Sequence, residues 1–287
     1  MAQAIAPSGK GPPRSLLRPI APLASLLAPM VDAAADPATL LSVEAGVATI
    51  TLNRPKEKNS LGGPMLNSLC DNLKACMEDD AVRVIVLTNV GNTFCAGANL
   101  KGVGEAPRYS LVDLVKIMHE GPKPIVGRLN GHCLGGGVGI AAACDVSVIN
   151  ETCELGFTEV RIGVSPAIIS VVCLPKMSRA DAAELMLSGE KVPAAHAVKV
   201  GLLNYAVAPG ELDAKVNEII SKLVRGGPSA MAATKSLVYR VPSMPLEEAF
   251  KWTAGVSMKC FGSQEAQQGI MAFNQKKDAP WVPKPKL

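Results

Sequence analysis

The sequence has few aromatic residues and few histidines. Phe, Trp and Tyr together make up 3% of the 287 residues, and three histidines are present. So few aromatic side chains give no stacking platform for single-stranded nucleic acid, and the adjacent pair His132-Cys133 lacks the spacing of a metal site. Neither GxxxxGK(S/T) nor GxSxG occurs, which excludes a P-loop and a nucleophile elbow. No apolar run approaches the roughly 20 residues of a membrane span.

The rest of the composition is that of a globular protein with a sizeable core. Hydrophobic residues make up 48% of the chain and charged residues 19%. This length fits one large domain, or a domain with an appendage. The net charge of +4 is small and lies partly in the two ends of the chain, so an RNA-binding protein is a distant alternative that the composition disfavours.

The eight cysteines show no CxxC spacing, and several lie within apolar runs. This pattern predicts buried free thiols in a reducing compartment rather than a disulfide framework. No metal site is expected.

The two ends of the chain carry possible signals for the cellular compartment of the protein. Residues 1–31 contain Lys10, Arg14 and Arg18, with no acidic residue before Asp32. Such a segment suits an organellar transit peptide, which would direct the protein to the mitochondrial matrix. A disordered extension of a cytoplasmic protein fits equally well. The last three residues, Pro285-Lys286-Leu287, are one substitution away from the peroxisomal Ser-Lys-Leu address, which gives a third alternative.

The hydrophobic pattern predicts an α/β core followed by helices. Apolar runs such as Val82–Leu87 suit strands buried on both faces, and Leu41–Leu52 suits a hairpin. After Pro166 the spacing becomes helical, with segments at 178–187, 193–201, 211–224, 228–239, 245–260 and 263–274. We therefore expect an N-terminal extension at 1–36, an α/β core at 37–225 and a C-terminal helical region at 226–287.

A glycine-rich stretch, Asn130–Gly139, lies between the strand-like run Pro124–Val126 and the helix-like run Ile140–Ala143. Its three consecutive glycines, 135–137, leave backbone N–H groups uncovered at the start of a helix, where a negative charge is favoured. The stretch is therefore suited to hold either a phosphate or the oxyanion of a thioester.

Residues 137–142 also match the loose dinucleotide pattern GxGxxA, and Glu159 lies about 20 residues further on. An NAD(P)-dependent oxidoreductase is therefore one hypothesis. Two observations disfavour it. The pattern follows two or more earlier strands rather than the first strand of a domain, and Glu159 lies near a turn rather than at a strand end.

A second loop of small residues, Phe94–Lys101, follows the buried strand at 82–87. A free N–H in this loop could converge with one from the glycine-rich stretch. Two such donors form an oxyanion hole, which stabilises negative charge on a carbonyl oxygen.

Five motifs together resemble the crotonase (enoyl-CoA hydratase/isomerase) family from about Leu41 to the C-terminus. They are Asn53-Arg54-Pro55 with Asn59-Ser60-Leu61, Phe94–Lys101, Asn130–Gly137, Cys144-Asp145 and Thr158–Gly163. The resemblance implies a crotonase-type spiral of ββα units with a C-terminal helical region used in trimerisation, giving a homotrimer or a dimer of trimers. It also implies binding of acyl-CoA thioesters, with CoA as part of the substrate and no separate cofactor.

The resemblance implies site residues by position. Ala98 and Gly136 would supply the oxyanion N–H groups, and Glu159 would be the acid–base carboxylate. The other substrate-binding candidates are Lys56 and Lys101 for the CoA phosphates, Ala96, Gly135 and Gly139 along the loops, and Phe261, Phe273 and Lys277, which would close over CoA from a neighbouring subunit.

The sequence departs from the family pattern at Gly139, where two-glutamate hydratases carry a second carboxylate. A site with one glutamate resembles Δ3,Δ2-enoyl-CoA isomerases, and also hydratase-like members such as bacterial methylglutaconyl-CoA hydratases. The run Glu159–Ser170 is similar to the latter. We therefore expect hydration of a short or branched 2-enoyl-CoA, with isomerisation by Glu159 as sole base the alternative.

Overall fold

A computed structural model describes residues 36–101 and 106–283 of the chain. Residues 37–287 form one compact unit. The transit-peptide and peroxisomal hypotheses concern residues 1–31 and 285–287, which lie outside the described residues, so the location of the protein remains a prediction.

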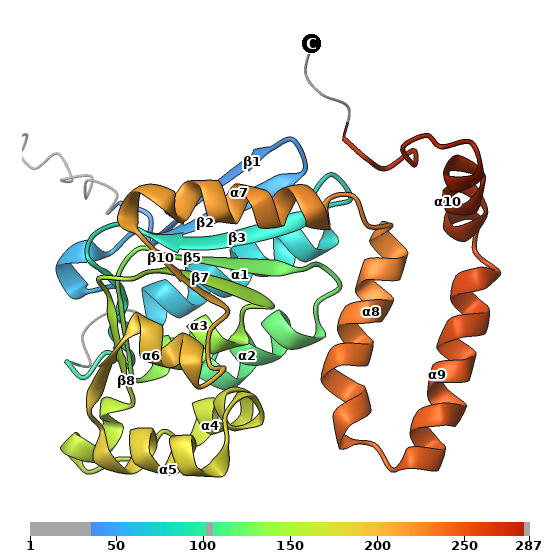
Figure 1. Cartoon of the computed structure of the whole chain (residues 1–287). Helices are drawn as coiled ribbons and strands as arrows, with labels where there is room; N and C mark the ends of the chain where they lie inside the picture. The colour runs from blue at the N-terminus through green and yellow to red at the C-terminus, as the bar shows by residue number, and fades with distance from the viewer. Residues whose placement is uncertain (1–35, 102–105, 284–287) are drawn as a thin grey trace, which may run out of the picture. The chain divides into compact units, whose positions relative to one another are not determined.

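The main sheet has six strands in the order β1-β2-β3-β5-β7-β10 (Figure 1). β1 and β2 are antiparallel, and every other neighbouring pair is parallel. The strands are β1 (Thr39–Glu44), β2 (Val47–Leu52), β3 (Val84–Asn89), β5 (Ile125–Leu129), β7 (Val146–Asn150) and β10 (Tyr205–Val207). The hairpin and the buried strand expected from the sequence are confirmed, and β10 is an addition.

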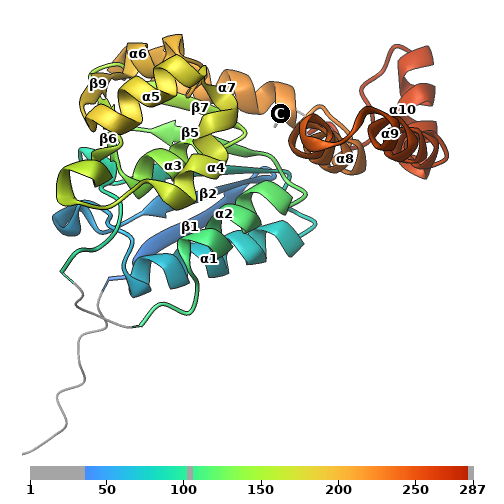
Figure 2. The ribbon, with the colours of Figure 1, turned by 90° about the horizontal axis from the view of Figure 1, so that it is seen from below.

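β3 is buried on both faces, as its apolar sequence predicts. Val84 and Val86 belong to a cluster with Leu212 of helix α7 (Leu212–Leu223), whereas Ile85 and Leu87 belong to the larger core. The larger core also contains residues of the helices α1 (Gly63–Glu78), α2 (Leu111–Glu120) and α3 (Gly136–Ala143), so helices cover both faces of the sheet (Figures 1 and 2).

A second sheet has four short strands in the order β4-β6-β8-β9. They are β4 (Thr93–Cys95), β6 (His132–Leu134), β8 (Glu154–Gly156) and β9 (Lys191–Pro193). β4, β6 and β8 each follow a strand of the main sheet and precede a helix or helical turn, so the chain repeats a strand–strand–helix unit. This arrangement confirms the expected α/β spiral.

The helices before residue 200 surround these sheets. They are α1 (Gly63–Glu78), α2 (Leu111–Glu120), α3 (Gly136–Ala143), α4 (Ala167–Cys173), α5 (Arg179–Ser188) and α6 (Ala194–Lys199), with the short 3-10 helices η1 (Pro55–Glu57), η2 (Thr158–Ile162) and η3 (Leu174–Lys176). Two features differ from the sequence prediction. α3 begins at Gly136, with β6 between it and β5, and α4 was not anticipated.

The C-terminal helices confirm the expected helical extension. They are α7 (Leu212–Leu223), α8 (Pro228–Arg240), α9 (Leu246–Phe261) and α10 (Gln264–Asn274), with η4 (Pro209–Glu211) and η5 (Val241–Ser243). α8, α9 and α10 lie beside the sheet layers (Figures 1 and 2). None of the described helices is long and apolar enough to cross a membrane.

Polar contacts to Asp145 attach α8 to the core. The buried Lys235 Nζ donates hydrogen bonds to Asp145 Oδ2 at 2.8 Å, Met118 O at 2.7 Å and Lys123 O at 2.9 Å. Tyr239 OH donates to Asp145 Oδ1 at 2.7 Å. The ammonium group is therefore fully hydrogen-bonded, as a buried charge must be.

All eight cysteines are free, and seven of them are buried. This result confirms the interpretation of the cysteine pattern as core thiols.

Candidate active site

The two glycine-containing loops are brought together by strand pairing. β4 and β6 are parallel, with Cys95 opposite Cys133. Beyond these strands the loops touch through their backbones: a Cβ added to Gly97 would lie 3.0 Å from Gly136 N and 3.0 Å from Leu134 O. Gly97 has a φ of 85°, so it tolerates both the backbone conformation and the close approach.

The N–H groups of Ala98 and Gly136 have no hydrogen-bond acceptor among the described residues. The neighbouring backbone groups are paired: Leu61 N–H donates to Gly97 O at 2.8 Å, and Asn99 N–H donates to Leu61 O at 3.4 Å. Gly136 is the first residue of α3, where the N–H groups lack partners within the helix and the dipole favours an anion. Two adjacent loops thus offer two free backbone donors.

Glu159 lies against the same loop. A Cβ added to Gly135 would lie 3.2 Å from Glu159 Oε1 and 3.4 Å from Glu159 Cδ. Gly135 has φ 51° and ψ −127°, a conformation that residues with a side chain rarely adopt. The glycine therefore serves two purposes: it permits the turn into α3, and it leaves room for the carboxylate beside Gly136.

The Glu159 carboxylate is buried on one side and has no charged partner. Its Oε2 atom is buried without a hydrogen-bond partner among the described residues. Burial raises the pKa of Glu159 above its usual value, an effect that a hydrogen bond from its own backbone N–H partly opposes. Arg161, two residues away, pairs with Glu190 instead. A carboxylate in this environment can accept and return a proton.

Gly139 faces a filled space. A Cβ added there would lie 2.1 Å from Ile169 Cγ2 and 2.6 Å from Ile169 Cβ. Both distances are far below van der Waals contact. A side chain of α4 therefore fills the space beside position 139, where the sequence departs from the two-glutamate pattern.

The same contacts explain the dinucleotide-like pattern. Residues 137–142 lie inside α3 rather than in a strand-to-helix turn. Gly137 is required by packing, because a Cβ there would lie 2.1 Å from Cys95 O. The spacing of Gly137 and Gly139 thus reflects close contacts of a buried helix with β4 and α4, rather than a pyrophosphate-binding turn.

The lysines proposed for CoA lie on the surface near the Ala96 loop. Lys56 in η1 and Lys101 are both exposed. Lys58 O accepts a hydrogen bond from Ala96 N–H at 3.0 Å, so the segment containing Lys56 adjoins the loop that carries Ala98. Their proximity is compatible with phosphate binding, and their role remains a prediction.

The three C-terminal candidates are not brought to this site within one chain. Phe261 and Phe273 are 72% and 83% exposed, and Lys277 is exposed. Phe261 lines a cavity of about 820 Å³ between the C-terminal helices, together with Trp252 and Trp281. Neither Glu159 nor either amide donor lines this cavity. Their approach from a neighbouring subunit remains a prediction.

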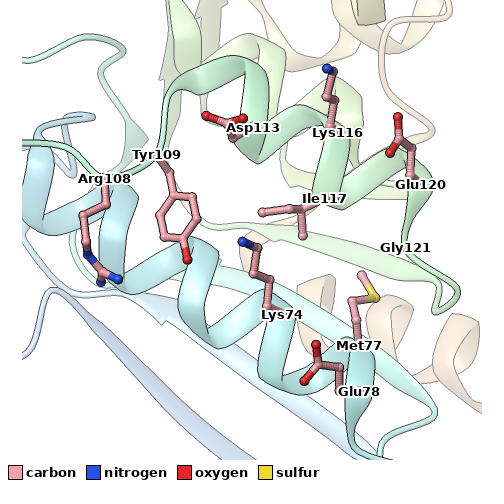
Figure 3. Close-up of a pocket in the computed structure, with 10 residues that line it drawn as sticks. All are labelled: Lys74, Met77, Glu78, Arg108, Tyr109, Asp113, Lys116, Ile117, Glu120 and Gly121. Carbon is pink, nitrogen blue, oxygen red and sulfur yellow. The ribbon is translucent and has the colours of Figure 1, made fainter.

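A separate pocket of about 560 Å³ lies between α1 and α2 (Figure 3). Two of its charged lining residues have partners: Arg108 pairs with Asp71 at 2.5 Å, and Asp113 accepts hydrogen bonds from Ser110 at the start of α2. None of the predicted site residues lines it. The described part of the chain has no group of three or more His, Cys, Asp or Glu residues that could hold a metal ion.

A spiral of paired strands that presents two backbone donors beside one carboxylate is suited to binding and protonating a carbonyl compound. Comparison with known proteins gives the family. The family described as enoyl-CoA hydratase/isomerase matches residues 42–284. The chain therefore belongs to the enoyl-CoA hydratase/isomerase family, which confirms the resemblance and the expectation of a hydratase-like enzyme.

Individual relatives agree with this assignment. A Thermus thermophilus protein that carries an enoyl-CoA hydratase name is 34% identical over 83% of this chain and 98% of its own length. The crotonyl-CoA hydratase of Syntrophomonas wolfei is 27% identical over 85% of this chain and 98% of its own. The crystal structure of an enoyl-CoA hydratase from Mycobacterium smegmatis has 31% identity and a TM-score of 0.79, covering 86% of this chain and 99% of that one.

Sequence reasoning missed two residues beside the site. In the sequence, Ile169 stands out only as part of the run after Glu159, and Cys95 only as a core thiol and a member of the Phe94–Lys101 loop. No spacing in the sequence indicates that Ile169 meets Gly139, because their contact depends on the packing of α4 on α3. The contact between Cys95 O and Gly137 also has no signal in the sequence, because it depends on how the chain bends after β4.

Proposed function

We propose that the protein adds water to a short or branched 2-enoyl-CoA. The observation that carries this proposal is the position of one half-buried, unpaired carboxylate, Glu159, against Gly135 and next to the free N–H of Gly136. The Ala98 N–H lies on the adjoining loop. Family membership supports an acyl-CoA thioester as the substrate.

The two amides would bind the thioester oxygen of the substrate. Addition of a nucleophile at C3 moves negative charge onto that oxygen and gives an enolate. Donors fixed in advance by the strands β4 and β6 would stabilise this charge without reorganising, an effect that contributes about 3–4 kcal/mol per donor in comparable sites. The dipole of α3 adds to the Gly136 donor.

Glu159 would move the proton. Its carboxylate accepts a proton from water as the water oxygen bonds to C3. The resulting carboxylic acid then donates that proton to C2, so that the water supplies both the hydroxyl group and the hydrogen of the 3-hydroxyacyl product. Burial raises the pKa of Glu159, which makes the protonated intermediate state easier to reach near neutral pH.

The CoA moiety would lie over the exposed lysines. Lys56 and Lys101 adjoin the Ala98 loop and carry the charge that phosphates require. We propose that Ala96 and Gly135 border the acyl thioester, whereas Gly139 is covered by Ile169. Phe261, Phe273 and Lys277 would complete the site from a neighbouring subunit of a homotrimer or a dimer of trimers. No separate cofactor takes part in this scheme.

A second candidate function is Δ3,Δ2-enoyl-CoA isomerisation. The observation that favours it is the contact between Gly139 and Ile169, which leaves no room for a second carboxylate at position 139 beside Glu159. One base suffices to remove a proton from C2 of a 3-enoyl-CoA and return it at C4, with the enolate held by the same two amides.

Product identification separates the two functions. The purified protein is offered 2-enoyl-, 3-enoyl- and methylglutaconyl-CoA, and the products are identified by mass spectrometry. The proposal predicts a 3-hydroxyacyl-CoA from at least one 2-enoyl substrate. Double-bond migration without any 3-hydroxyacyl product would instead support the isomerase, and turnover that requires NAD(P)H would contradict both.

A further inference from the structure

We propose that Asn59 is a positioning residue, which holds the Ala98 N–H in the direction that the substrate oxygen requires. This role rests on the proposed function, because it concerns the oxyanion hole of the same site. Asn59 belongs to the motif Asn59-Ser60-Leu61 and takes no part in the proton transfer itself. The supporting observations are its hydrogen bonds, its burial and its backbone conformation.

The Asn59 side chain is fully buried, and both N–H groups of its amide are used. Nδ2 donates to Val90 O at 3.1 Å and to Thr93 O at 2.8 Å, and Oδ1 accepts a hydrogen bond from Arg54 N–H at 2.7 Å. Val90 follows β3, and Thr93 is the first residue of β4. One buried amide group therefore binds the turn between these strands to the segment that begins at Arg54.

Asn59 also turns the backbone. Its φ is 50°, and that of Lys58 is 52°, so successive residues adopt the left-handed conformation, which asparagine tolerates better than most residues with a side chain. Asn59 N–H donates to Arg54 O at 2.9 Å, in addition to the hydrogen bond that the side chain accepts from Arg54. The turn is thus closed by backbone and side chain together, and the chain leaves it in a fixed direction.

The segment held by this turn lies alongside the loop that carries Ala98. Ala96 N–H donates to Lys58 O at 3.0 Å, and Leu61 N–H donates to Gly97 O at 2.8 Å. Leu61 and Ala98 form a parallel β-bridge. The position of the Ala98 loop therefore depends on the residues on either side of the turn.

The hydrogen bond from Leu61 to Gly97 O fixes the direction of the free donor. Gly97 O and the Ala98 N–H belong to the same peptide group, which is planar and trans, as are all described peptide bonds. In such a group the C=O and N–H bonds point in opposite directions. The Ala98 N–H therefore points away from Leu61, and a shift of Leu61 would turn the donor away from the substrate oxygen.

The test observes the donor through the carbonyl group that it should bind. Butyryl-CoA, a saturated acyl-CoA that cannot be hydrated, is isotopically labelled at its thioester carbon. Infrared difference spectroscopy then measures the C=O stretching frequency of the bound thioester, which falls when the oxygen accepts a hydrogen bond. The measurement is made on the parent protein and on its variants, and kcat and KM for 2-enoyl-CoA hydration are measured in parallel.

Asn59→Gly is the main variant, because it removes the amide group and still tolerates a positive φ. The control is Asn72→Ala. The Nδ2 atom of this part-buried asparagine donates to Thr39 Oγ1 at 2.8 Å, a hydrogen bond between α1 and β1 rather than one with either donor loop. Both variants lose an asparagine hydrogen bond, but only the first releases the Ala98 loop.

In Asn59→Gly we expect the C=O frequency shift to be about half of that in the parent and kcat to fall about tenfold or more with KM nearly unchanged, since one of two donors is misdirected. Asn72→Ala should keep the full shift and the parent kcat. An unchanged frequency shift in folded Asn59→Gly would overturn the role of Asn59. Absence of any shift in the parent would instead contradict the proposed oxyanion hole.

A second variant, Asn59→Asp, applies if the glycine variant does not fold. It keeps the size of the side chain, the acceptor for Arg54 N–H and the tolerance of a positive φ. Charged or protonated, it can donate to at most one of the carbonyl groups of Val90 and Thr93. We expect a smaller frequency shift than in the parent, and the full shift in folded Asn59→Asp would also overturn the proposal.

Discussion

Cys95 and Cys133 lie opposite each other on the parallel strands β4 and β6, and each stands three residues before one of the two free amides, those of Ala98 and Gly136. Strand register thus places the two proposed oxyanion donors side by side. The Cys95 thiol also accepts a hydrogen bond from Gly97 N–H at 3.4 Å, at the bend between the strand and Ala98.

Removing the Cys95 thiol should therefore weaken catalysis. We expect Cys95→Ala to lower kcat about fivefold with little change in KM, since loss of one hydrogen bond of about 1 kcal/mol loosens the Ala98 donor. Cys95→Ser retains an acceptor and should recover most of the activity. Cys133→Ala is the control, because that thiol donates a hydrogen bond to Gly131 O at 3.7 Å and is not the acceptor of the Gly97 N–H. An equal loss of kcat in both alanine variants would contradict the positioning role.

Gly135 should resist substitution for two separable reasons. Its backbone conformation implies a loss of about 1–3 kcal/mol in Gly135→Ala, and the new Cβ would meet Glu159 Oε1 at 3.2 Å. The control is Gly46→Ala, which has a φ of 80° in the β1–β2 turn, where the Cβ would meet Arg83 Cγ at 3.2 Å. Both variants should be less stable in urea unfolding, but only Gly135→Ala should lose kcat. An unchanged kcat in folded Gly135→Ala would show that the space between residue 135 and Glu159 Oε1 is not needed for catalysis.

The Lys235–Asp145 pair should contribute strongly to the attachment of α8. The two side chains are 6% and 17% exposed, and removing one partner from a buried pair costs about 3 kcal/mol or more. We expect this loss for Lys235→Met in urea unfolding. Lys222→Met, which breaks an exposed pair with Glu218, should leave the stability nearly unchanged, because water screens an exposed pair. Similar losses of unfolding free energy in the two variants would mean that the buried pair stabilises the protein no more than the exposed pair does.

Glu159 should make stability depend on pH. Burial raises its pKa in the folded protein above the usual 4.5, so the folded state holds this proton more tightly than the unfolded state. The group therefore imposes no penalty below pH 4.5, and stability falls as the pH rises through the folded pKa. In Glu159→Gln this fall should be absent. Urea unfolding of both proteins between pH 4.5 and 8 measures it, and parallel stability curves would contradict the raised pKa.

Much of the fold was predictable from the sequence because its signals are local. Helical spacing and proline or glycine boundaries indicated α5 and α7–α10, and the continuous apolar run indicated β3. The short helix α4 was missed because its residues, Ala167–Cys173, form an apolar run that suits a strand as well as a helix.

The site was predictable only in part. The small residues of the two loops indicated free backbone N–H groups, and the family resemblance assigned them to Ala98 and Gly136. The closure of position 139 by Ile169 depends on how two helices pack, and the role of the Cys95 thiol depends on one loop conformation. Such contacts join residues that no local pattern connects.

The most direct test of the proposed mechanism is the turnover of 2-enoyl-CoA by Glu159→Gln. The substitution keeps the shape of the side chain and removes its ability to accept a proton. The account predicts a 3-hydroxyacyl-CoA product from the parent protein and a fall in kcat of about 10²–10⁴-fold in the variant, with its thermal unfolding preserved. Unchanged turnover of every enoyl-CoA by the folded variant would show that Glu159 is not the base.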